Sequence, residues 1–216
     1  MKIVFATGNP HKLKELKEIA GDCGIDFILP PDGFDPVENG KTFEENSLIK
    51  AREAAKLSGE VSLADDSGLC VDALNGEPGI YSARYAETPQ KRIDKLLENL
   101  RHCEEHLKNV TSQSHNNEIT THSLNARNDM TDNRRAKFVC SMSLVKSNGD
   151  IIFQTIGECH GHIATKQAGT NGFGYDPIFI PDGYTSTIAE LSEEEKNLIS
   201  HRGNALRKVL EYIRNN

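Results

Sequence analysis

Two adjacent carboxylates follow a short apolar run in the first third of the chain. Residues 61–64 are predicted to form a strand, and Asp65, Asp66 and Ser67 come directly after it. Because side chains alternate along an extended chain, the two carboxylates should point to opposite sides, so that the scaffold holds one while the other faces a cleft. Acids at a strand end suit Mg²⁺ binding or general-base catalysis. A plain turn fits the same stretch equally well, since Asp, Ser and Gly are common in turns.

A second candidate is the loop that follows the first predicted strand, residues 3–6. The loop consists, in order, of Thr7, Gly8, Asn9, Pro10, His11 and Lys12. Asn9 is a good N-cap and Pro10 suits the first helical position, so this loop should lead into a helix whose free N–H groups can receive phosphate. His11 and Lys12 lie where the helix dipole disfavours cations, which indicates a docked anion; a solvated lysine is the alternative.

A glycine-rich aromatic segment near residue 175 could hold a planar ring. Gly172 and Gly174 flank Phe173 and free the backbone for close approach. Phe173 and Tyr175 supply flat faces on which a base can stack, and Asp176 can accept a hydrogen bond from a ring N–H. The alternative is a glycine turn whose aromatic side chains belong to the core.

The start of the last helix carries two cations. Ser200 is predicted to cap it, and His201 and Arg202 follow in the first turn, again the unfavourable end for positive charge. This arrangement indicates that an electron-rich group is recognised there. Lys196 lies just before it, on a short helix predicted to begin with a capping box at Ser192.

The remaining elements are predicted from caps and turns. Thr42 should cap a helix whose capping box is completed by Glu45. On pattern alone, Lys50 and Arg52 of that helix are interpreted as surface charges. Residues 136–145 and 151–159 should be strands joined by a hairpin at residues 148–149.

Residues 102–133 differ in composition from the rest of the chain. They are rich in Asn, Ser, Thr and His and have few large apolar side chains, so they are interpreted as a largely mobile polar insertion. His102, Cys103 and His106 have a helical spacing that zinc can use, but no second pair of ligands with matching spacing follows.

Composition limits the classes of function. The 216 residues suffice for one domain, in one or two lobes, and the formal net charge of −7 argues against a general nucleic-acid-binding surface. No apolar run approaches the length of a membrane span, and the N-terminus lacks a signal-peptide pattern. The five widely spaced cysteines are typical of reduced thiols in a cytoplasmic protein.

Taken together, the motifs resemble those of the inosine triphosphate pyrophosphatase (XTP/dITP diphosphatase) family. The matching segments occur in family order and span nearly the whole chain: residues 7–12, 42–46, 64–69, 79–85, 173–177 and 200–202. The resemblance implies an α/β fold with a long mixed central sheet and flanking helices, forming two lobes around a nucleotide cleft. It also implies Mg²⁺-dependent hydrolysis of ITP, dITP and XTP to the monophosphate and pyrophosphate, by a homodimer.

The resemblance assigns roles by position. Asp66 corresponds to the catalytic proton acceptor and metal ligand, and Glu38 to a second metal-associated acid. The triphosphate would be held by residues 7–12, chiefly Thr7, Asn9 and Lys12, with Lys50 adding a contact and Ser67 touching the substrate. The base pocket would consist of Phe173, Gly174, Tyr175, Asp176, Lys196, His201 and Arg202.

The chain departs from the family pattern at two places. Asn171 stands where a second glycine is usual, and residues 102–133 lengthen a connection that is short in most relatives. Three alternatives remain: a nucleotide sensor without turnover, a nucleic-acid-binding module, and a pyrophosphatase for another modified nucleotide, such as a pyrimidine.

Overall fold

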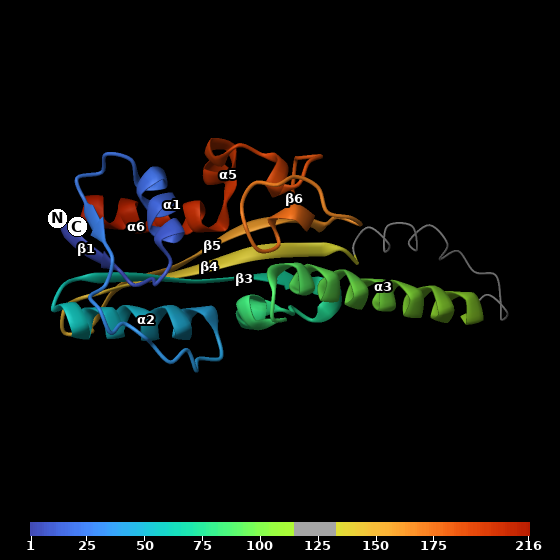
Figure 1. The fold of residues 1–216 in the computed structure, drawn as a ribbon, viewed down its shortest axis with the longest axis horizontal. Helices are drawn as coiled ribbons and strands as arrows, with labels where there is room; N and C mark the ends of the chain where they lie inside the picture. Colours follow the sequence, from blue (N-terminus) through green and yellow to red (C-terminus); the bar gives the residue numbers. More distant parts are fainter. Residues whose placement is uncertain (115–132) are drawn as a thin grey trace. The chain divides into compact units, whose positions relative to one another are not determined.

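Six strands form one mixed sheet in the order β2-β1-β3-β4-β5-β6, and helices flank it (Figure 1). The computed structural model describes residues 1–114 and 133–216. The strands are β1 (Lys2–Phe5), β2 (Asp26–Ile28), β3 (Ser62–Val71), β4 (Arg135–Val145), β5 (Ile151–Ile163) and β6 (Phe179–Pro181). The α-helices are α1 (Pro10–Ala20), α2 (Phe43–Ser58), α3 (Pro89–Ser114), α5 (Glu193–Ile199) and α6 (His201–Asn215). The predicted fold class is confirmed.

The chain divides into two compact units. The first comprises residues 1–68, 138–159 and 194–216, and the second comprises residues 69–137 and 160–193. In the parts of the chain that the structure describes, no helix is long and apolar enough to cross a bilayer. All five cysteines carry free thiols, as the sequence predicted.

The first unit is built on the parallel strands β1, β2 and β3. Side chains of β1 and of the next residue, Ala6, alternate between the two faces of the sheet. Ile3 and Phe5 pack in the apolar cluster that includes α1 and α6, while Val4 and Ala6 pack with α2. Figure 1 shows α1 and α6 together on one side of these strands and α2 on the other. Leu63 and Ala64 of β3 follow the same alternation, which sets the direction of the two residues that come next.

The predicted end of the third strand is wrong, and so is the alternative turn. β3 does not stop at Ala64 but continues through Asp65, Asp66 and Ser67 to Val71. The strand was predicted to end at Ala64 because the apolar run ends there. Carboxylates can continue a buried strand only where they have partners, since unpaired buried charges are costly. In the structure both acids have cationic partners from other elements, so the strand can carry them in its interior.

The predicted caps at Thr42 and Ser200 and the hairpin are confirmed. Thr42 caps α2 by accepting a hydrogen bond from the Glu45 N–H, and the Glu45 carboxylate accepts from the N–H of Lys41, one residue before the expected position. Ser200 caps α6 by accepting from Gly203. The turn between β4 and β5 closes through a 2.8 Å bond from the Lys146 N–H to the Asp150 carbonyl.

Within the described residues, the second unit contains α3, four short 3-10 helices and β6, together with the adjoining ends of β3, β4 and β5. The 3-10 helices span Asp72–Leu74, Gly79–Arg84, Asp176–Ile178 and Ile188–Glu190. Its core includes Val71 at the end of β3 and apolar side chains of these elements, among them Ile93, Leu96, Leu100, Ile178, Phe179 and Ile188. Strand β6 pairs antiparallel with the last residues of β5, with His162 opposite Ile180.

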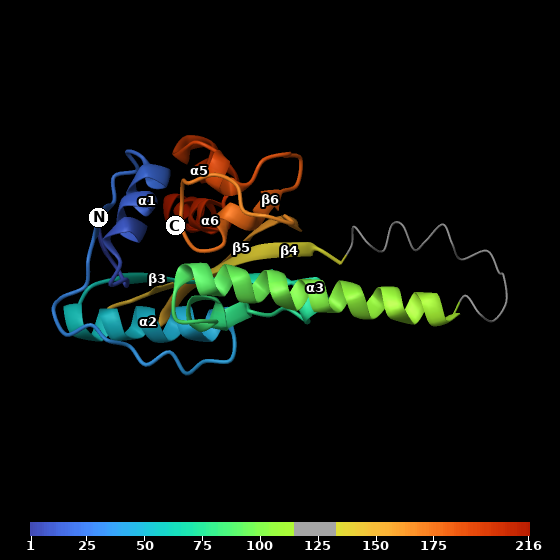
Figure 2. The same ribbon diagram turned by 45° about the vertical axis from the view of Figure 1, so that its right-hand side comes forward.

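The predicted start of the polar insertion, at residue 102, is wrong. Residues 102–114 continue helix α3, drawn in green in Figure 2, rather than opening a polar segment. Ion pairs explain the continuation, because Glu105 lies one turn from Arg101 and Glu104 pairs with Arg134 at 2.8 Å. His102, Cys103 and His106 therefore lie on α3. The rest of the predicted insertion, apart from Asn133, falls outside the described residues.

Candidate active site

The loop after β1 opens a pocket because β1 is shorter than β3. The last paired residue of β1 is Phe5, opposite Leu63, whereas β3 runs on past Asp65. In parallel sheets, ligands bind at this carboxyl edge of the strands. A pocket of about 280 Å³ lies here, lined by Ala6, Thr7, Gly8, Asn9, Lys12, Phe34, Asp35, Pro36, Glu38, Lys50 and Asp65.

The predicted phosphate loop has the expected local structure. Thr7 is buried and its hydroxyl accepts a 3.1 Å hydrogen bond from the Asn9 N–H, which holds the turn. Helix α1 begins at Pro10, as predicted, and His11 lies in its first turn. Gly8 leaves open space, since a Cβ there would meet no protein atom within 4 Å. The start of α1 is therefore open to a ligand in the pocket.

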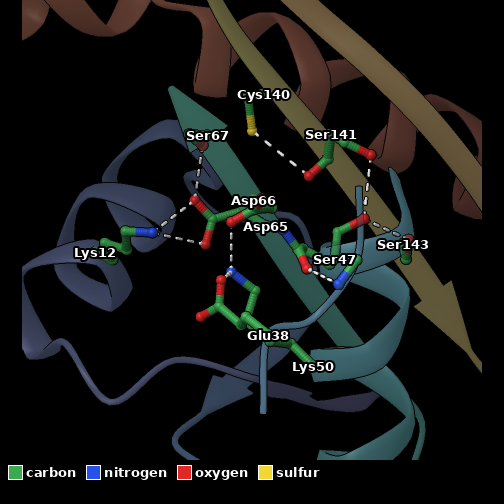
Figure 3. Close-up of polar contacts among 12 residues, drawn as sticks. Lys12, Glu38, Ser47, Lys50, Asp65, Asp66, Ser67, Cys140, Ser141 and Ser143 are labelled. Carbon is green, nitrogen blue, oxygen red and sulfur yellow. Dashed lines mark hydrogen bonds and ion pairs between the residues drawn. The ribbon is translucent and has the colours of Figure 1, made fainter. Parts of the chain in front are cut away.

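Asp65 is fully buried and is held by two cations. Lys12 Nζ lies 3.1 and 3.0 Å from its two carboxylate oxygens, and Arg202 Nε and Nη2 each lie 3.2 Å from Oδ2 (Figure 3 shows the Lys12 pair). Ser67 Oγ also donates to Oδ2. Burial alone would raise the pKa of Asp65, but Lys12, Arg202 and Lys50 hold it far below its usual range. Asp65 is thus a permanent anion that organises its neighbours.

Asp66 points to the opposite face of β3, as the alternation predicted, and it meets α2. Its Oδ1 accepts a 2.8 Å bond from Lys50 Nζ, which also lies 3.4 Å from Glu38 Oε2 (Figure 3). Burial raises the pKa of Asp66, Lys50 opposes this, and Glu38 and Asp65 add to it. Asp66 Oδ2 is buried and has no hydrogen-bond partner among the described residues. One oxygen of this acid is therefore oriented by Lys50, and the other makes no hydrogen bond within the described residues.

The interpretation of Lys50 as a surface charge is wrong. Its side chain is buried, with 8% of the residue exposed. Burial by itself lowers the pKa of Lys50, but the negative charges of Asp65, Asp66 and Glu38 more than compensate and raise it. Lys50 is thus a fixed cation between two carboxylates. Arg52, by contrast, is exposed and donates to the Gly149 carbonyl.

The start of α6 lies against the Asp65 side of the site. Arg202 is 1% exposed, and its Nη1 pairs with Glu15 of α1 at 2.6 Å in addition to its bonds with Asp65. His201 is buried and stacks on Phe138, with ring centroids 4.9 Å apart. Its Nδ1 has no hydrogen-bond partner in the described part of the chain.

Burial, together with the charges of Arg202 and Lys196, lowers the pKa of His201 well below its ordinary value. The ring is therefore neutral at physiological pH. Lys196 is half-buried on α5, in the same unit, and its charge is one of those that lower the pKa of His201.

The glycine-rich segment belongs to the second unit. Gly172 and Gly174 have left-handed backbone angles, φ of 75° and 64°. Asp176 is buried and its Oδ2 accepts from the Phe173 N–H at 2.9 Å, so this carboxylate shapes the loop. Tyr175 is buried and donates to the Ser82 carbonyl at 3.1 Å. Phe173 is 52% exposed, so of Phe173 and Tyr175 it is the one whose ring is accessible for stacking.

The carboxylates of the first unit fit a magnesium ion. Asp66 supplies an unpartnered buried oxygen, and Glu38 supplies a second carboxylate that shares Lys50 with it. Over the described residues, no group of three or more His, Cys, Asp and Glu side chains forms a closed metal cage.

Three residues that contribute to this site were not predicted as site residues from the sequence. Glu15 fixes Arg202, Phe138 stacks on His201, and Asn46 of α2 accepts from Gly40 beside Glu38. Glu15 lies three residues after Lys12, on the same face of α1, which is a signal that spacing alone can give. Asn46 lies in the matching segment 42–46, but the pattern does not reveal its bond to Gly40. Nothing in the pattern links Phe138 to the site, because the tertiary fold brings it to His201.

Comparison with known proteins agrees with the motifs. The profile of the Ham1 family matches residues 3–116 and 105–212. The dITP/XTP pyrophosphatase of Shigella flexneri is 42% identical over 223 residues, covering 99% of this chain and 98% of that protein. The protein of the same name from Escherichia coli (strain K12) is 41% identical, with the same coverage.

Solved structures show the same fold. The HAM1 protein from Coxiella burnetii superposes with a TM-score of 0.78 at 38% identity, over all of both chains. The Staphylococcus aureus Ham1 protein has a TM-score of 0.78 at 37% identity, covering 100% of this chain and 99% of that one. With motifs, profile and fold in agreement over nearly its whole length, this chain belongs to the Ham1 family.

Proposed function

We propose that this protein hydrolyses deaminated purine nucleoside triphosphates, namely ITP, dITP and XTP, to the monophosphate and pyrophosphate, with Mg²⁺. The observation that carries the proposal is the pocket at the end of β1. It combines an open helix start with Lys12, Glu38 and Lys50, and the available acid Asp66 lies beside it in contact with Lys50. About 40% identity over the full length to proteins named dITP/XTP pyrophosphatase supports a hydrolase that acts on nucleotide anhydrides.

The triphosphate would bind at the start of α1. The N–H groups of the first helical turn and the positive end of the helix dipole attract phosphate oxygens. Thr7 holds the loop in shape, Gly8 leaves room for close approach, and Lys12 supplies a charge that Asp65 has already oriented. Preorganised cations of this kind stabilise the charge that develops on the leaving pyrophosphate.

Asp66 is the proposed general base. Its raised pKa brings the carboxylate closer to the acidity of the water it must activate, and Lys50 orients it through Oδ1 while Oδ2 remains available. Glu38 and Asp66 would hold the metal ion. Mg²⁺, when bound, neutralises phosphate charge and orients the triphosphate for in-line attack. Ser67 donates to Asp65, and its contact with the substrate is part of the proposal.

Base recognition is proposed for the start of α6 and for the glycine-rich segment. Hypoxanthine and xanthine carry an oxygen acceptor at C6 where adenine carries an amino donor, so buried donors left unpaired by adenine discriminate strongly. The neutral His201 ring, with Nδ1 unpartnered in the described chain, is the group that best supports this assignment. Arg202 already donates to two carboxylates, Asp65 and Glu15, so its own contact with the base stays a prediction. The role of residues 173–176 stays a prediction.

Assembly and compartment follow the resemblance. We propose a homodimer that works in the cytoplasm. The five free thiols support a reducing compartment.

A substrate panel tests the proposed function. Pyrophosphate release is measured with Mg²⁺ for dITP, ITP, XTP, dATP, dGTP and dUTP. We expect kcat/KM for the three deaminated purines to exceed that for the others by about 100-fold or more. A preference for dUTP would favour the pyrimidine alternative, and tight binding of dITP without turnover would favour the sensor.

A further inference from the structure

The stretch between β2 and α2 carries Glu38 without regular secondary structure. Residues 29–42 form neither helix nor strand, yet Phe34, Pro36 and Glu38 line one wall of the pocket. Within this stretch the Asn39 N–H donates to the Val37 carbonyl at 3.0 Å, which closes one tight turn only. The position of Glu38 therefore depends on contacts that the stretch makes with other elements.

The first turn of α2 supplies such contacts. Asn46 is completely buried, and its Oδ1 accepts a 2.9 Å hydrogen bond from the Gly40 N–H. The carboxylate of Glu45 accepts from the next N–H, that of Lys41. The approach is so close that a Cβ on Gly40 would lie 2.7 Å from Asn46 Oδ1. Two consecutive side chains of α2 thus hold two consecutive N–H groups of the stretch.

The same face of α2 also holds the Glu38 side chain. Lys50 follows Asn46 by four residues, one helical turn, and its Nζ lies 3.4 Å from Glu38 and 2.8 Å from Asp66. An aspartate at position 46 would supply the same acceptor but would add a negative charge to a face that already meets two carboxylates. Asparagine supplies the acceptor without that charge. Its Nδ2 is buried and has no hydrogen-bond partner within the described residues. An unpaired buried donor costs free energy, so stability alone does not explain an asparagine at this position.

We propose that Asn46 is a positioning residue that acts through Glu38. By fixing the backbone at Gly40, it sets the place of the Glu38 carboxylate beside Lys50 and Asp66, where the metal ion and the triphosphate are to bind. The inference rests on the proposed function, since it concerns the acid assigned to the metal, and it adds to the site a residue whose side chain touches neither reactant nor metal.

A double-mutant cycle tests the coupling to Glu38. The variants are Asn46→Ala, Glu38→Gln and the double variant, assayed for pyrophosphate release from dITP. We expect Asn46→Ala to lower kcat about 100-fold, because misplacing a catalytic group by about 1 Å has this effect. In the Glu38→Gln background the same change should lower kcat by less than about twofold, because residues that act through each other are not additive. Equal losses in both backgrounds would overturn the proposal.

Thr42→Ala is the matched control for stability. Thr42 caps the same helix end but its side chain accepts from Glu45, not from the stretch. Its loss weakens α2 while the Gly40 bond remains, so kcat should stay within about twofold of the wild-type value. If Thr42→Ala lowers kcat as much as Asn46→Ala at similar thermal stability, the role of Asn46 is structural only.

Limited proteolysis gives a readout that does not depend on activity. Lys41 is exposed and adjoins the bond that Asn46 makes. Trypsin cleavage after Lys41, followed by mass spectrometry, should accelerate about tenfold or more in Asn46→Ala relative to Thr42→Ala, because the stretch opens locally. Equal cleavage rates would contradict the positioning role even if wild-type protein hydrolyses dITP. An inactive wild-type protein with the expected cleavage pattern would instead contradict the proposed function.

Discussion

Asp65 and Asp66 are neighbours in sequence, but they meet different charges. Asp65 faces α1 and α6, where Lys12 and Arg202 hold it as an anion. Asp66 faces α2, where Lys50 engages one oxygen and leaves the other without a partner in the described chain. The period of two along a strand is enough to separate an anchoring acid from the proposed base.

Replacing Arg202 tests the anchoring role. Arg202→Ala leaves the buried Asp65 and the half-buried Glu15 without their shared partner, and removing one member of a buried ion pair costs about 3–5 kcal/mol. We expect urea unfolding to show a loss of this size. The control is Arg135→Ala, which breaks an exposed pair with Asp182 and should cost less than about 1 kcal/mol. Similar losses in both variants would mean that the buried network does not stabilise the fold.

The lowered pKa of His201 should make the free energy of unfolding depend on pH. Its folded pKa lies well below the unfolded value, so between the two the unfolded chain binds one more proton than the folded protein. The stability from the neutral ring is complete above about pH 6.5 and falls with decreasing pH by up to about 1.4 kcal/mol per unit. Urea unfolding from pH 7 to pH 5 should show this slope.

The His201→Gln variant should lose that slope, although its stability at pH 7 also falls because the contact with Phe138 is lost. His160→Gln, at an exposed histidine of β5, is the control and should keep the slope. A slope unchanged in His201→Gln would assign it to other groups.

At the scale of elements, the pocket exists because two parallel strands end at different places. β1 stops at Phe5 and turns into α1, whereas β3 continues and presents its acids beyond that end. The loop between β1 and α1 can therefore approach a ligand with its backbone. The proposed phosphate site therefore depends on this difference in strand length as much as on any side chain.

Gly8→Ala tests whether phosphate approaches the loop backbone. A methyl group there meets no protein atom within 4 Å and Gly8 has no left-handed backbone, so stability should change by less than about 0.5 kcal/mol. We expect KM for dITP to rise about tenfold, because the methyl group occupies the space of the ligand.

Gly59→Ala is the matched control and should show the reverse. It has open space but a φ of 69° at the C-cap of α2, so stability should fall by about 1 kcal/mol while KM is unchanged. An unchanged KM in Gly8→Ala would place the triphosphate elsewhere.

Local sequence signals predicted where helices begin, whereas the length of β3 and the burial of Lys50 depend on tertiary partners. Pro10, Thr42 and Ser200 mark helix starts correctly because capping depends on residues within one turn. The length of β3 could not be predicted, because Asp65 is stabilised by Arg202, which is 137 positions away. The burial of Lys50 was missed for the same reason.

At the scale of the whole molecule, the order of the motifs predicted more than their individual patterns did. Each motif alone had a structural alternative, but their joint occurrence indicated the family that the full-length comparisons confirm. In the first unit, residues 7–9, Lys12, Glu38 and Lys50 line one pocket, and Asp66 forms an ion pair with Lys50 beside it. The segment 173–176 belongs to the second unit, so its part in holding the base is still a prediction.

The proposed chemistry rests on Asp66 as the group that activates water. Asp66→Asn keeps the volume of the side chain and an acceptor for Lys50, so the variant should fold. The decisive measurement is pyrophosphate release from dITP with Mg²⁺ by wild type and Asp66→Asn at equal concentrations of folded protein. We predict turnover by the wild type and a kcat at least about 100-fold lower in the variant, the usual contribution of a general base. Turnover of the variant within about twofold of the wild type would contradict the account.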